Sequence, residues 1–197
     1  MTMIKKRTIV HLISGLNRAG AESVLTRLVL NDHYYTHVVV SMTGKGDLGA
    51  ELEHNGVKLV SLNFKKSRIN FEGILKFYRL LNNEEVLCLQ TWMYHADFLG
   101  GIIGKFVRCK VFWNIRHSNF SLRDDKLLTF VIMCINALLS HFIPKKIICC
   151  AHASKASHSK MGYSSRKMVV IENGIDIEKY RPSNETRIKF RKYNNIS

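Results

Sequence analysis

The sequence predicts an α/β fold with a doubly wound, Rossmann-like parallel sheet of about seven strands and helices on both faces. Short apolar runs rich in β-branched residues alternate almost without exception with segments whose apolar residues recur at helical spacing. The first run, residues 8–14, leads through turn residues 15–20 into a helical pattern that begins at Ala21. The positive helix end at such a turn suits an anion, most often a phosphate.

Each element has its own signal. Seven strands are expected at residues 8–14, 35–43, 57–62, 86–91, 111–115, 146–151 and 168–171. The first helix is expected to begin at Ala21. Further helices are expected at residues 48–54, 71–81, 98–106, 127–142 and 154–161. Asn55 and Gly56 predict a helix stop, and Asn70 predicts a helix start. Glycines at positions 100, 101 and 104 are costly in a helix unless another element packs closely against them.

Length and composition predict one domain with a tail. With 197 residues, of which 46% are hydrophobic, the chain can bury a sizeable core. We expect this domain to span residues 1–180, followed by a polar linker or frayed helix at residues 181–197. The most apolar window, residues 130–144, is shorter than the about 20 residues that a membrane-spanning helix needs. It predicts a buried helix, with a helix that dips into the membrane interface as the alternative.

The charge balance restricts the partners. Thirty Lys and Arg residues against fifteen Asp and Glu residues give a net charge of +15. Such a surplus is typical of chains that meet nucleic acid, anionic membranes or phosphorylated ligands. No recognisable helix-turn-helix, zinc-finger or RRM-type motif is present, so no specific nucleic acid is expected. An anionic inner-leaflet surface fits the same charge.

Cysteine usage and the start of the chain predict a cytoplasmic protein. The five cysteines lie at positions 88, 109, 134, 149 and 150, with no C-x-x-C spacing that would indicate a zinc or redox motif. We therefore expect free thiols in a reducing cytosol. Only seven residues of apolar strand follow the basic start, so no secretory leader is expected.

Ligands of a doubly wound sheet collect beyond the C-terminal ends of its strands. The loops at those ends begin at Gly15, Gly44, Asn63, Trp92, Arg116, His152 and Asn173. A nucleotide-binding or dinucleotide-binding Rossmann protein is one alternative for this fold. Against it, the glycines of the first turn are spaced as G-x-x-x-x-G instead of G-x-G-x-x-G, and no acidic residue closes the second strand.

Three segments resemble the N-terminal half of family 4 glycosyltransferases, which are two-domain GT-B enzymes that use activated sugars. Residues 16–22, LNRAGAE, are similar to the family's Gly-Gly-Ala-Glu loop after the first strand. His117 follows a mid-sheet strand in the segment NIRHS. Residues 169–182, with VVIENGID followed by Tyr180-Arg181-Pro182, are similar to the family segment that closes the first domain.

The resemblance implies a retaining transfer from a sugar nucleotide, with no metal and no other cofactor. It implies that Ala19, Gly20 and Ala21 bind the donor diphosphate through backbone N–H groups. It also makes His117 the active-site histidine next to the reacting carbon of the donor sugar. No D-x-D near a strand end indicates a metal site.

The remaining polar residues at the strand ends are candidates for the acceptor. We expect acceptor binding by basic or histidine side chains, drawn from Arg18, Lys65, Lys66, Arg68, His95 and Arg116. The expected acceptor is a lipid-linked or glycan molecule of bacterial surface polysaccharide or lipopolysaccharide synthesis. The expected location is the inner face of the cytoplasmic membrane, to which the protein binds peripherally.

The chain departs from the family pattern in two places. Ala19 stands where the family usually has a glycine, and its Cβ narrows the approach of a ligand to the backbone. The family's donor domain, with an Arg/Lys pair and two glutamates separated by seven residues, has no counterpart, because Glu172, Glu178 and Glu185 are six and seven positions apart. The isolated chain is therefore expected to be inactive without a donor-binding domain. A split enzyme, a truncated non-catalytic remnant and a basic nucleic-acid-binding Rossmann protein remain the alternatives.

Overall fold

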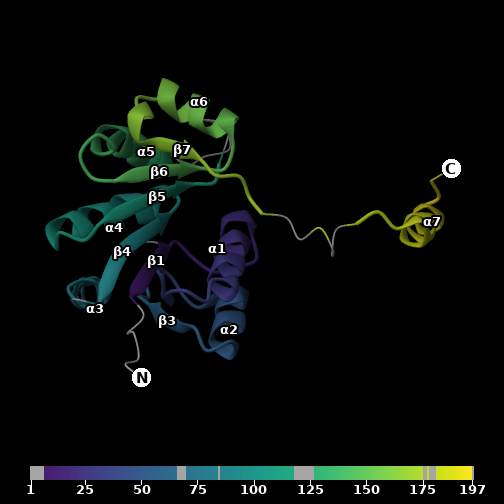
Figure 1. The fold of residues 1–197 in the computed structure, drawn as a ribbon, viewed down its shortest axis with the longest axis horizontal. Coiled ribbons are helices and arrows are strands. Elements are labelled where there is room, and N and C mark those ends of the chain that lie inside the picture. The colour runs from purple at the N-terminus through teal and green to yellow at the C-terminus, as the bar shows by residue number, and fades with distance from the viewer. Residues whose placement is uncertain are drawn as a thin grey trace.

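The computed structural model describes residues 7–65, 70–83, 85–117, 127–174, 177 and 181–196. Its centre is a sheet of seven parallel strands in the order β3-β2-β1-β4-β5-β6-β7 (Figure 1). Helices cover both faces of the sheet (Figure 1). The doubly wound parallel sheet that the sequence predicts is therefore confirmed.

The bounds of the elements follow the sequence patterns closely. The strands are β1 Thr8–Ile13, β2 Thr36–Ser41, β3 Lys58–Ser61, β4 Val86–Trp92, β5 Val111–Ile115, β6 Lys146–Cys149 and β7 Met168–Val170. The helices are α1 Gly20–Asn31, α2 Gly46–His54, α3 Phe71–Leu81, α4 Tyr94–Phe106, α5 Leu127–Leu139, α6 His152–Lys160 and α7 Asn184–Tyr193, with a 3-10 turn at Ser165–Lys167.

Two apolar cores lie on the two faces of the sheet. On one face, Leu25 of α1 and Leu52 of α2 pack against Ile13, Val39 and Trp92. The core of the other face is larger and includes Trp113 of β5 and buried residues of α3, α4 and α5, among them Phe77, Ala96, Met133 and Ala137. The strands are apolar along their length because a parallel sheet is buried on both sides.

The glycines of α4 are explained by its close packing on the sheet. A Cβ at Gly100 would lie 2.6 Å from Thr91 Cγ2, and one at Gly104 would lie 2.6 Å from Val111 Cγ2. Both contacts are shorter than real Cβ atoms allow, so α4 can approach β4 and β5 only without side chains here. The expectation that another element packs closely against these glycines is confirmed.

The expectation of a buried helix at residues 130–144 is wrong, and the predicted helix start at Asn70 is confirmed without the expected cap bond. Only Met133, Asn136 and Ala137 of α5 are buried, whereas the sequence predicted a buried helix. Since α5 lies in an outer layer, one stripe suffices to cover the sheet and α4, and its other face is exposed. Asn70 stands at the N-cap of α3 without capping it, because its Nδ2 donates instead to the carbonyl oxygen of Leu62 at 2.9 Å.

The tail contains a short helix. Residues 184–193 form α7, which is capped by the hydroxyl of Ser183 and buries none of its residues. Figure 1 shows α7 away from the sheet, beyond the segment that follows β7. Within the described residues, no helix is both long enough and apolar enough to cross a membrane.

Candidate functional site

The candidate site lies where the strand order reverses. From β1 the chain proceeds to β2 and β3 on one side, and it returns to β4 on the other side of β1 (Figure 1). The loops after β1 and β4 therefore lead to opposite sides of the sheet, and in doubly wound sheets the ligand-binding crevice forms at this point of the C-terminal edge. The loop at residues 14–19 and the turn at Met93 border this crevice.

The N-terminus of α1 faces this crevice without a cap. Ala19 occupies the N-cap position in an extended conformation, and no side chain accepts from the first turn. Ala19 and Gly20 are exposed, and a Cβ at Gly20 would meet no atom within 4 Å. The unpaired N–H groups of the first turn, including that of Ala21, are therefore open to an anion. This geometry agrees with the diphosphate role predicted for Ala19, Gly20 and Ala21, which stays a prediction.

The loop before α1 is held in place by the start of α2. The backbone N–H of Leu48 donates to the carbonyl oxygen of Leu16 at 3.0 Å, and Thr43 Oγ1 donates to that of Ser14 at 3.0 Å. Gly46 has a φ of +56°, and a Cβ there would lie 2.5 Å from the carbonyl of Leu16. Gly46 therefore shapes the loop that carries the anion site, a role that sequence reasoning missed.

Arg116 joins β5 to the segment after β7. Its Nη1 donates to Asn173 Oδ1 at 2.8 Å and to the carbonyl oxygen of Ile171 at 3.4 Å. Its Nη2 donates to Asn114 Oδ1 at 3.2 Å, and its Cζ lies 5.1 Å from the ring centroid of Trp92. Burial lowers the pKa of Arg116 from its ordinary value, although a guanidinium remains charged in proteins. Both Nη groups of Arg116 thus bind other parts of the protein. Contact of Arg116 with an acceptor stays a prediction.

Asn114 helps to hold the side chain of Arg116 in place. It is fully buried, and its Nδ2 donates to the carbonyl oxygen of Thr91 at 3.0 Å. Its Oδ1 accepts from Gln90 Nε2 at 3.1 Å as well as from Arg116. The sequence signal for this arrangement is the pair of amide side chains, Gln90 and Asn114, inside otherwise apolar strands.

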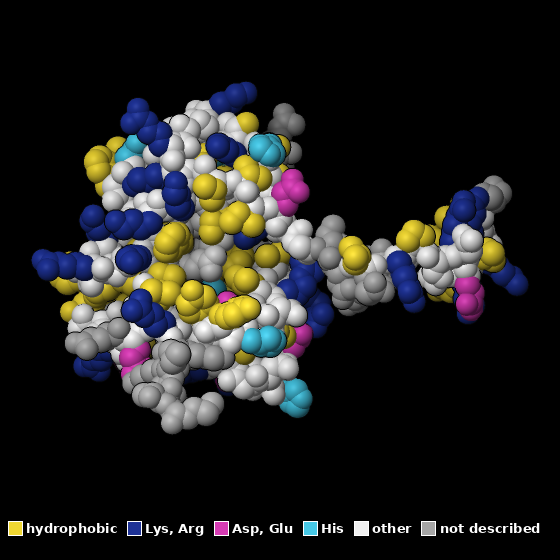
Figure 2. Space-filling view, viewed as in Figure 1, with side chains coloured by type: hydrophobic (Ala, Val, Ile, Leu, Met, Phe, Trp, Pro, Cys, Tyr) yellow, Lys and Arg dark blue, Asp and Glu magenta, His cyan; other side chains and the backbone are white. Residues whose placement is uncertain are grey.

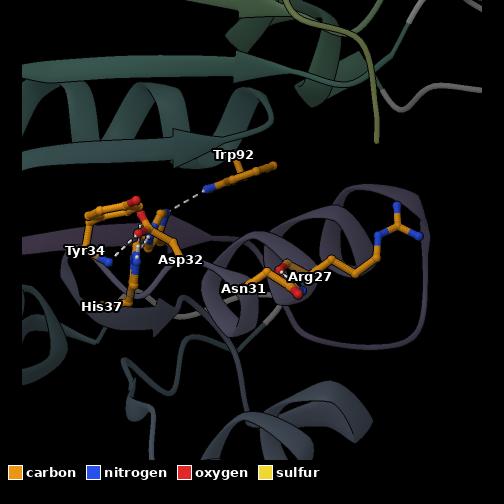
Figure 3. A network of polar contacts seen from close by, with 7 residues as sticks. Arg27, Asn31, Asp32, Tyr34, His37 and Trp92 are labelled. Carbon is orange, nitrogen blue, oxygen red and sulfur yellow. Dashed lines mark hydrogen bonds and ion pairs between the residues drawn. The ribbon is translucent and has the colours of Figure 1, made fainter. Parts of the chain in front are cut away.

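A chain of polar side chains runs from Trp92 beneath α1 (Figure 3). Trp92 Nε1 donates to His11 Nδ1 at 3.4 Å, and the distance from His11 Nε2 to His37 Nδ1 is 2.9 Å. His37 Nε2 lies 3.3 Å from Asp32 Oδ2, and Asp32 Oδ1 accepts from the backbone N–H of Tyr34 at 2.8 Å. The chain thus links the floor of the crevice to the C-terminal end of α1.

The chemistry of the donors fixes the tautomers in this chain. Because the indole N–H of Trp92 can only donate, His11 Nδ1 is the acceptor and His11 Nε2 carries the proton. His37 Nδ1 then accepts from His11, so the proton of His37 lies on Nε2 and faces Asp32. Burial, and next the charge of His37, lowers the pKa of His11 to about 3. Burial also lowers the pKa of His37 and outweighs the opposite effect of Asp32. Both imidazoles are therefore neutral at neutral pH.

The two histidines predicted from the sequence lie on neighbouring loops. His95 belongs to the first turn of α4, directly after Met93, whose φ of +71° turns the chain sharply out of β4. Burial lowers the pKa of His95, which favours its neutral form. His117 directly follows β5 and is half-buried, and its carbonyl oxygen accepts from Ser154 Oγ at 2.8 Å. The structure thus fixes the backbone of His117, while its catalytic role stays a prediction.

The other predicted acceptor residues are spread along the sheet edge. Arg18 is exposed and lies 3.7 Å from Glu51 Oε2, and Lys65 is exposed after β3. Lys66 and Arg68 lie outside the described residues. Four strand spacings separate β3 from β5, which is about 19 Å. Lys65 and Arg116 are therefore too far apart to hold one small group together.

A second buried polar cluster lies on the opposite face of the sheet. Tyr94 Oη lies 2.8 Å from His158 Nε2, and His158 Nδ1 donates to the carbonyl oxygen of Ser154. Asp97 is fully buried and accepts from Thr91 Oγ1 at 2.5 Å. Burial raises the pKa of Asp97 well above its ordinary value, with the Thr91 bond acting in the opposite direction. Among the described residues, no group of three or more His, Cys, Asp or Glu side chains is arranged to hold a metal ion.

The strand order defines the class of fold: a doubly wound, Rossmann-like domain of the kind that forms one half of GT-B structures. The model of Glycosyltransferase Family 4 matches residues 7–179, so the chain belongs to this family. The resemblance drawn from residues 16–22, His117 and residues 169–182 is thereby confirmed at the level of the family.

Relatives agree with this assignment. Over 97 residues, which are 48% of this chain and 25% of the relative, the sequence is 31% identical to the capsular polysaccharide biosynthesis glycosyltransferase CapH of Staphylococcus aureus. The crystal structure of Anabaena Alr3699/HepE in complex with UDP has a TM-score of 0.77 at 18% identity, covering 95% of this chain and 50% of that one. The apo form of the lipopolysaccharide outer core galactosyltransferase WaaB has a TM-score of 0.60 at 14% identity, covering 89% and 50%. The chain thus spans about half the length of these solved structures.

Proposed function

We propose that this chain is the acceptor-binding half of a retaining, sugar-nucleotide-dependent glycosyltransferase. The acceptor is a lipid-linked or glycan precursor of bacterial surface polysaccharide or lipopolysaccharide, and the reaction takes place at the inner face of the cytoplasmic membrane. The observation that carries this proposal is the match of residues 7–179 to the family. The capsular polysaccharide and lipopolysaccharide enzymes among its relatives support the substrate class.

In this proposal a donor-binding half closes over the crevice. The uncapped N-terminus of α1 then offers the N–H groups of Gly20 and Ala21 to the diphosphate, on which negative charge builds up as the sugar leaves. Structures of HepE hold UDP and UDP-glucose, which supports a donor of this kind. No metal is required, because helix N–H groups and basic side chains supply the positive charge.

His117 is placed next to the reacting carbon of the donor sugar, and the other strand-end residues position the acceptor. His95 and Arg116, which follow β4 and β5, are the acceptor residues assigned to the reaction centre in this proposal. Lys65 and Arg18 lie farther along the edge and bind a more distant part of a long acceptor, such as its phosphate. Lys66 and Arg68 belong to the same basic segment of the sequence as Lys65.

The test requires both halves of the enzyme. The reading frame downstream is cloned, its product is purified together with this chain, and the release of UDP from UDP-glucose is measured with extracted membrane lipids as the acceptor. We expect turnover by the two halves together, and an at least 100-fold loss in His117→Ala, which is on the order of one removed transition-state contact. His54→Gln, which changes an exposed histidine at the C-terminal end of α2, serves as the control.

Three outcomes would contradict the proposal. Sugar-nucleotide turnover by the isolated chain would show that no second half is needed. Failure of the two halves to bind UDP in calorimetry would favour a non-catalytic remnant. Tight, salt-sensitive DNA binding with a sequence preference would favour a nucleic-acid-binding protein.

A further inference from the structure

An apolar groove lies between α3 and α4 on the outer side of the domain. Its volume is about 280 Å³, and its lining includes Leu75 and Tyr78 of α3 and Ile102 and Phe106 of α4. The Phe106 side chain is 78% exposed, and Leu75 and Ile102 are also exposed. Contiguous exposed apolar side chains of this kind usually mark a surface that another molecule covers.

A basic pocket adjoins this groove. It has a volume of about 630 Å³, and its five cationic lining residues are Lys105, Arg108, Lys110, Lys145 and Lys167. Its lining contains no acidic residue, and no ion pair within the described part of the chain involves any of these five. Burial, and then the charges of Lys105 and Lys145, lowers the pKa of Lys167. Like charges are thus gathered there without counter-charges.

The groove and the pocket meet at the C-terminal end of α4. Phe106 lines the groove and the preceding residue, Lys105, lines the pocket. Phe142 also lines the pocket and is 68% exposed, beyond the exposed apolar face of α5. Figure 2 shows Lys and Arg side chains gathered along the edge of the domain where α4 ends in Figure 1, with hydrophobic side chains between them.

We propose that the apolar groove and the basic pocket together form a docking surface for an anionic lipid bilayer. The cations of the pocket pair with the headgroups, and Phe106 and Phe142 enter the interface between headgroups and acyl chains. Basic side chains alone or apolar side chains alone bind a bilayer only weakly. The two kinds together give stable attachment to an anionic bilayer. The inference rests on the part of the proposed function that places the enzyme at a membrane.

The position of the surface favours a bilayer over the other half of the enzyme. The pocket includes Val111, the first residue of β5, and Lys145, which precedes β6, so it lies at the N-terminal ends of the strands. The crevice beside Gly20 lies at their C-terminal ends. A donor-binding half that closes over the crevice therefore leaves the docking surface free. A nucleic acid would account for the cations and could stack on aromatic rings, but it would not account for the exposed aliphatic lining of the groove, Leu75 and Ile102.

The test is sedimentation of the full chain with vesicles of phosphatidylcholine alone and vesicles that also contain phosphatidylglycerol. We expect binding only to the anionic vesicles, weakened by salt. The triple variant Lys105→Glu, Lys110→Glu, Lys145→Glu should bind at least about 100-fold more weakly, since each cation near the surface contributes about fivefold in affinity.

A matched control separates local from total charge. The triple variant Arg27→Glu, Lys58→Glu, Lys160→Glu changes the net charge equally at exposed residues of other elements, and it should lose less than about tenfold. A second variant, Phe106→Ser with Phe142→Ser, should lose the binding that persists at high salt. Because all these side chains are exposed, circular dichroism should show unchanged folding.

Several results would overturn the inference. The two triple variants could bind the vesicles equally well, or the chain could bind both kinds of vesicle equally well. The double phenylalanine variant could also keep its binding to vesicles and lose self-association instead, which would make the groove a contact between copies of the chain. UDP binding and transfer with the second half are measured on the same proteins. Failure of vesicle binding with transfer retained removes the docking surface alone, whereas failure of transfer with vesicle binding retained removes the proposed enzyme and leaves the surface.

Discussion

His11 Nε2 donates to His37 Nδ1 across 2.9 Å in the interior beneath α1. The two rings are stacked with centroids 5.2 Å apart, and they stand on the adjacent strands β1 and β2. In the neutral pair, His11 Nδ1 accepts from Trp92 while His11 Nε2 donates to His37, so a second proton on His11 would lie on Nδ1 and face the indole N–H. Protonation of His11 would also place a positive charge in the fully buried interior.

Acid should therefore unfold the protein through this pair. The pKa of His11 in the folded state, about 3, lies below its ordinary value, so its contribution to stability is complete above about pH 6.5 and is lost as the pH falls toward 3. We expect a loss of up to about 1.4 kcal/mol for each pH unit below 6.5. Urea unfolding of the wild type and of His11→Gln at a series of pH values should show a smaller loss in the variant. Equal slopes, or an equal change in the exposed His54→Gln control, would contradict this role.

Asp97 should behave in the opposite sense. Its pKa is raised in the folded state, so its contribution to stability is present below its unfolded pKa and is lost as the pH rises through the folded value. We expect Asp97→Asn to be at least as stable as the wild type at neutral pH and to gain no advantage in acid. Thermal unfolding of the wild type and of Asp97→Asn at neutral pH and at acidic pH measures this difference.

Thr91→Val is the control for Asp97, because it removes the hydrogen bond to the carboxyl and keeps the carboxyl itself. It should destabilise by about 0.5–1.5 kcal/mol at either pH. A marked loss of stability in Asp97→Asn at neutral pH would show that the charged form is the one that the fold uses.

Arg116 and Asn173 should be energetically coupled. Their 2.8 Å hydrogen bond ties the end of β5 to the segment after β7, and a lysine cannot keep both this bond and the one to Asn114. A double-mutant cycle with Arg116→Lys and Asn173→Ala should give a coupling of about 0.5–1.5 kcal/mol in urea unfolding.

The exposed pair Arg18 and Glu51, 3.7 Å apart, is the comparison for that cycle. Its coupling should stay below about 0.5 kcal/mol, since solvent screens both charges. Equal coupling energies in the two cycles would mean that the contacts of Arg116 add nothing beyond a surface ion pair.

Gly20 and Gly46 should respond oppositely to alanine. A Cβ at Gly20 meets no atom, so Gly20→Ala should leave the free energy of unfolding unchanged or raise it by about 0.4–1 kcal/mol. Gly46→Ala should destabilise by at least about 1 kcal/mol, because Gly46 has a positive φ and lies against the backbone of Leu16.

The same two variants separate folding from binding. With the donor half present, Gly20→Ala should weaken UDP binding in calorimetry although it folds well, because the added methyl group stands where the diphosphate approaches. Unchanged UDP binding in a well-folded Gly20→Ala protein would remove the predicted phosphate contact.

The fold was predictable because each signal was local. Helix α3 was predicted with its observed bounds, and the stop at Asn55 and Gly56 is confirmed by a φ of +77° at Gly56. The exposed face of α5 was missed because periodicity does not tell which of two apolar stripes meets a neighbour. The start of α3 at Asn70 was also predictable, but not that its side chain donates to the carbonyl oxygen of Leu62, eight residues earlier.

The site was only partly predictable. A strand, a glycine turn and a helix place Gly20 correctly, because parallel strands end at one edge. Contacts between distant segments, such as those of Arg116 with Asn173 and of His11 with His37, could not be predicted from the sequence. A polar residue in a strand does not reveal its partner. The stacking of Arg116 on Trp92 depends on the order of β4 and β5, which the alternation of elements leaves open.

The bonds of Arg116 also determine how the chain leaves the sheet after β7. They hold Ile171 and Asn173 against the end of β5, so the chain leaves the sheet in a fixed direction. Gly174 follows at once, and a Cβ there would meet nothing within 4 Å. Loss of this one guanidinium would therefore release the segment at Ile171 and Asn173 from the end of β5 while the seven strands stay paired.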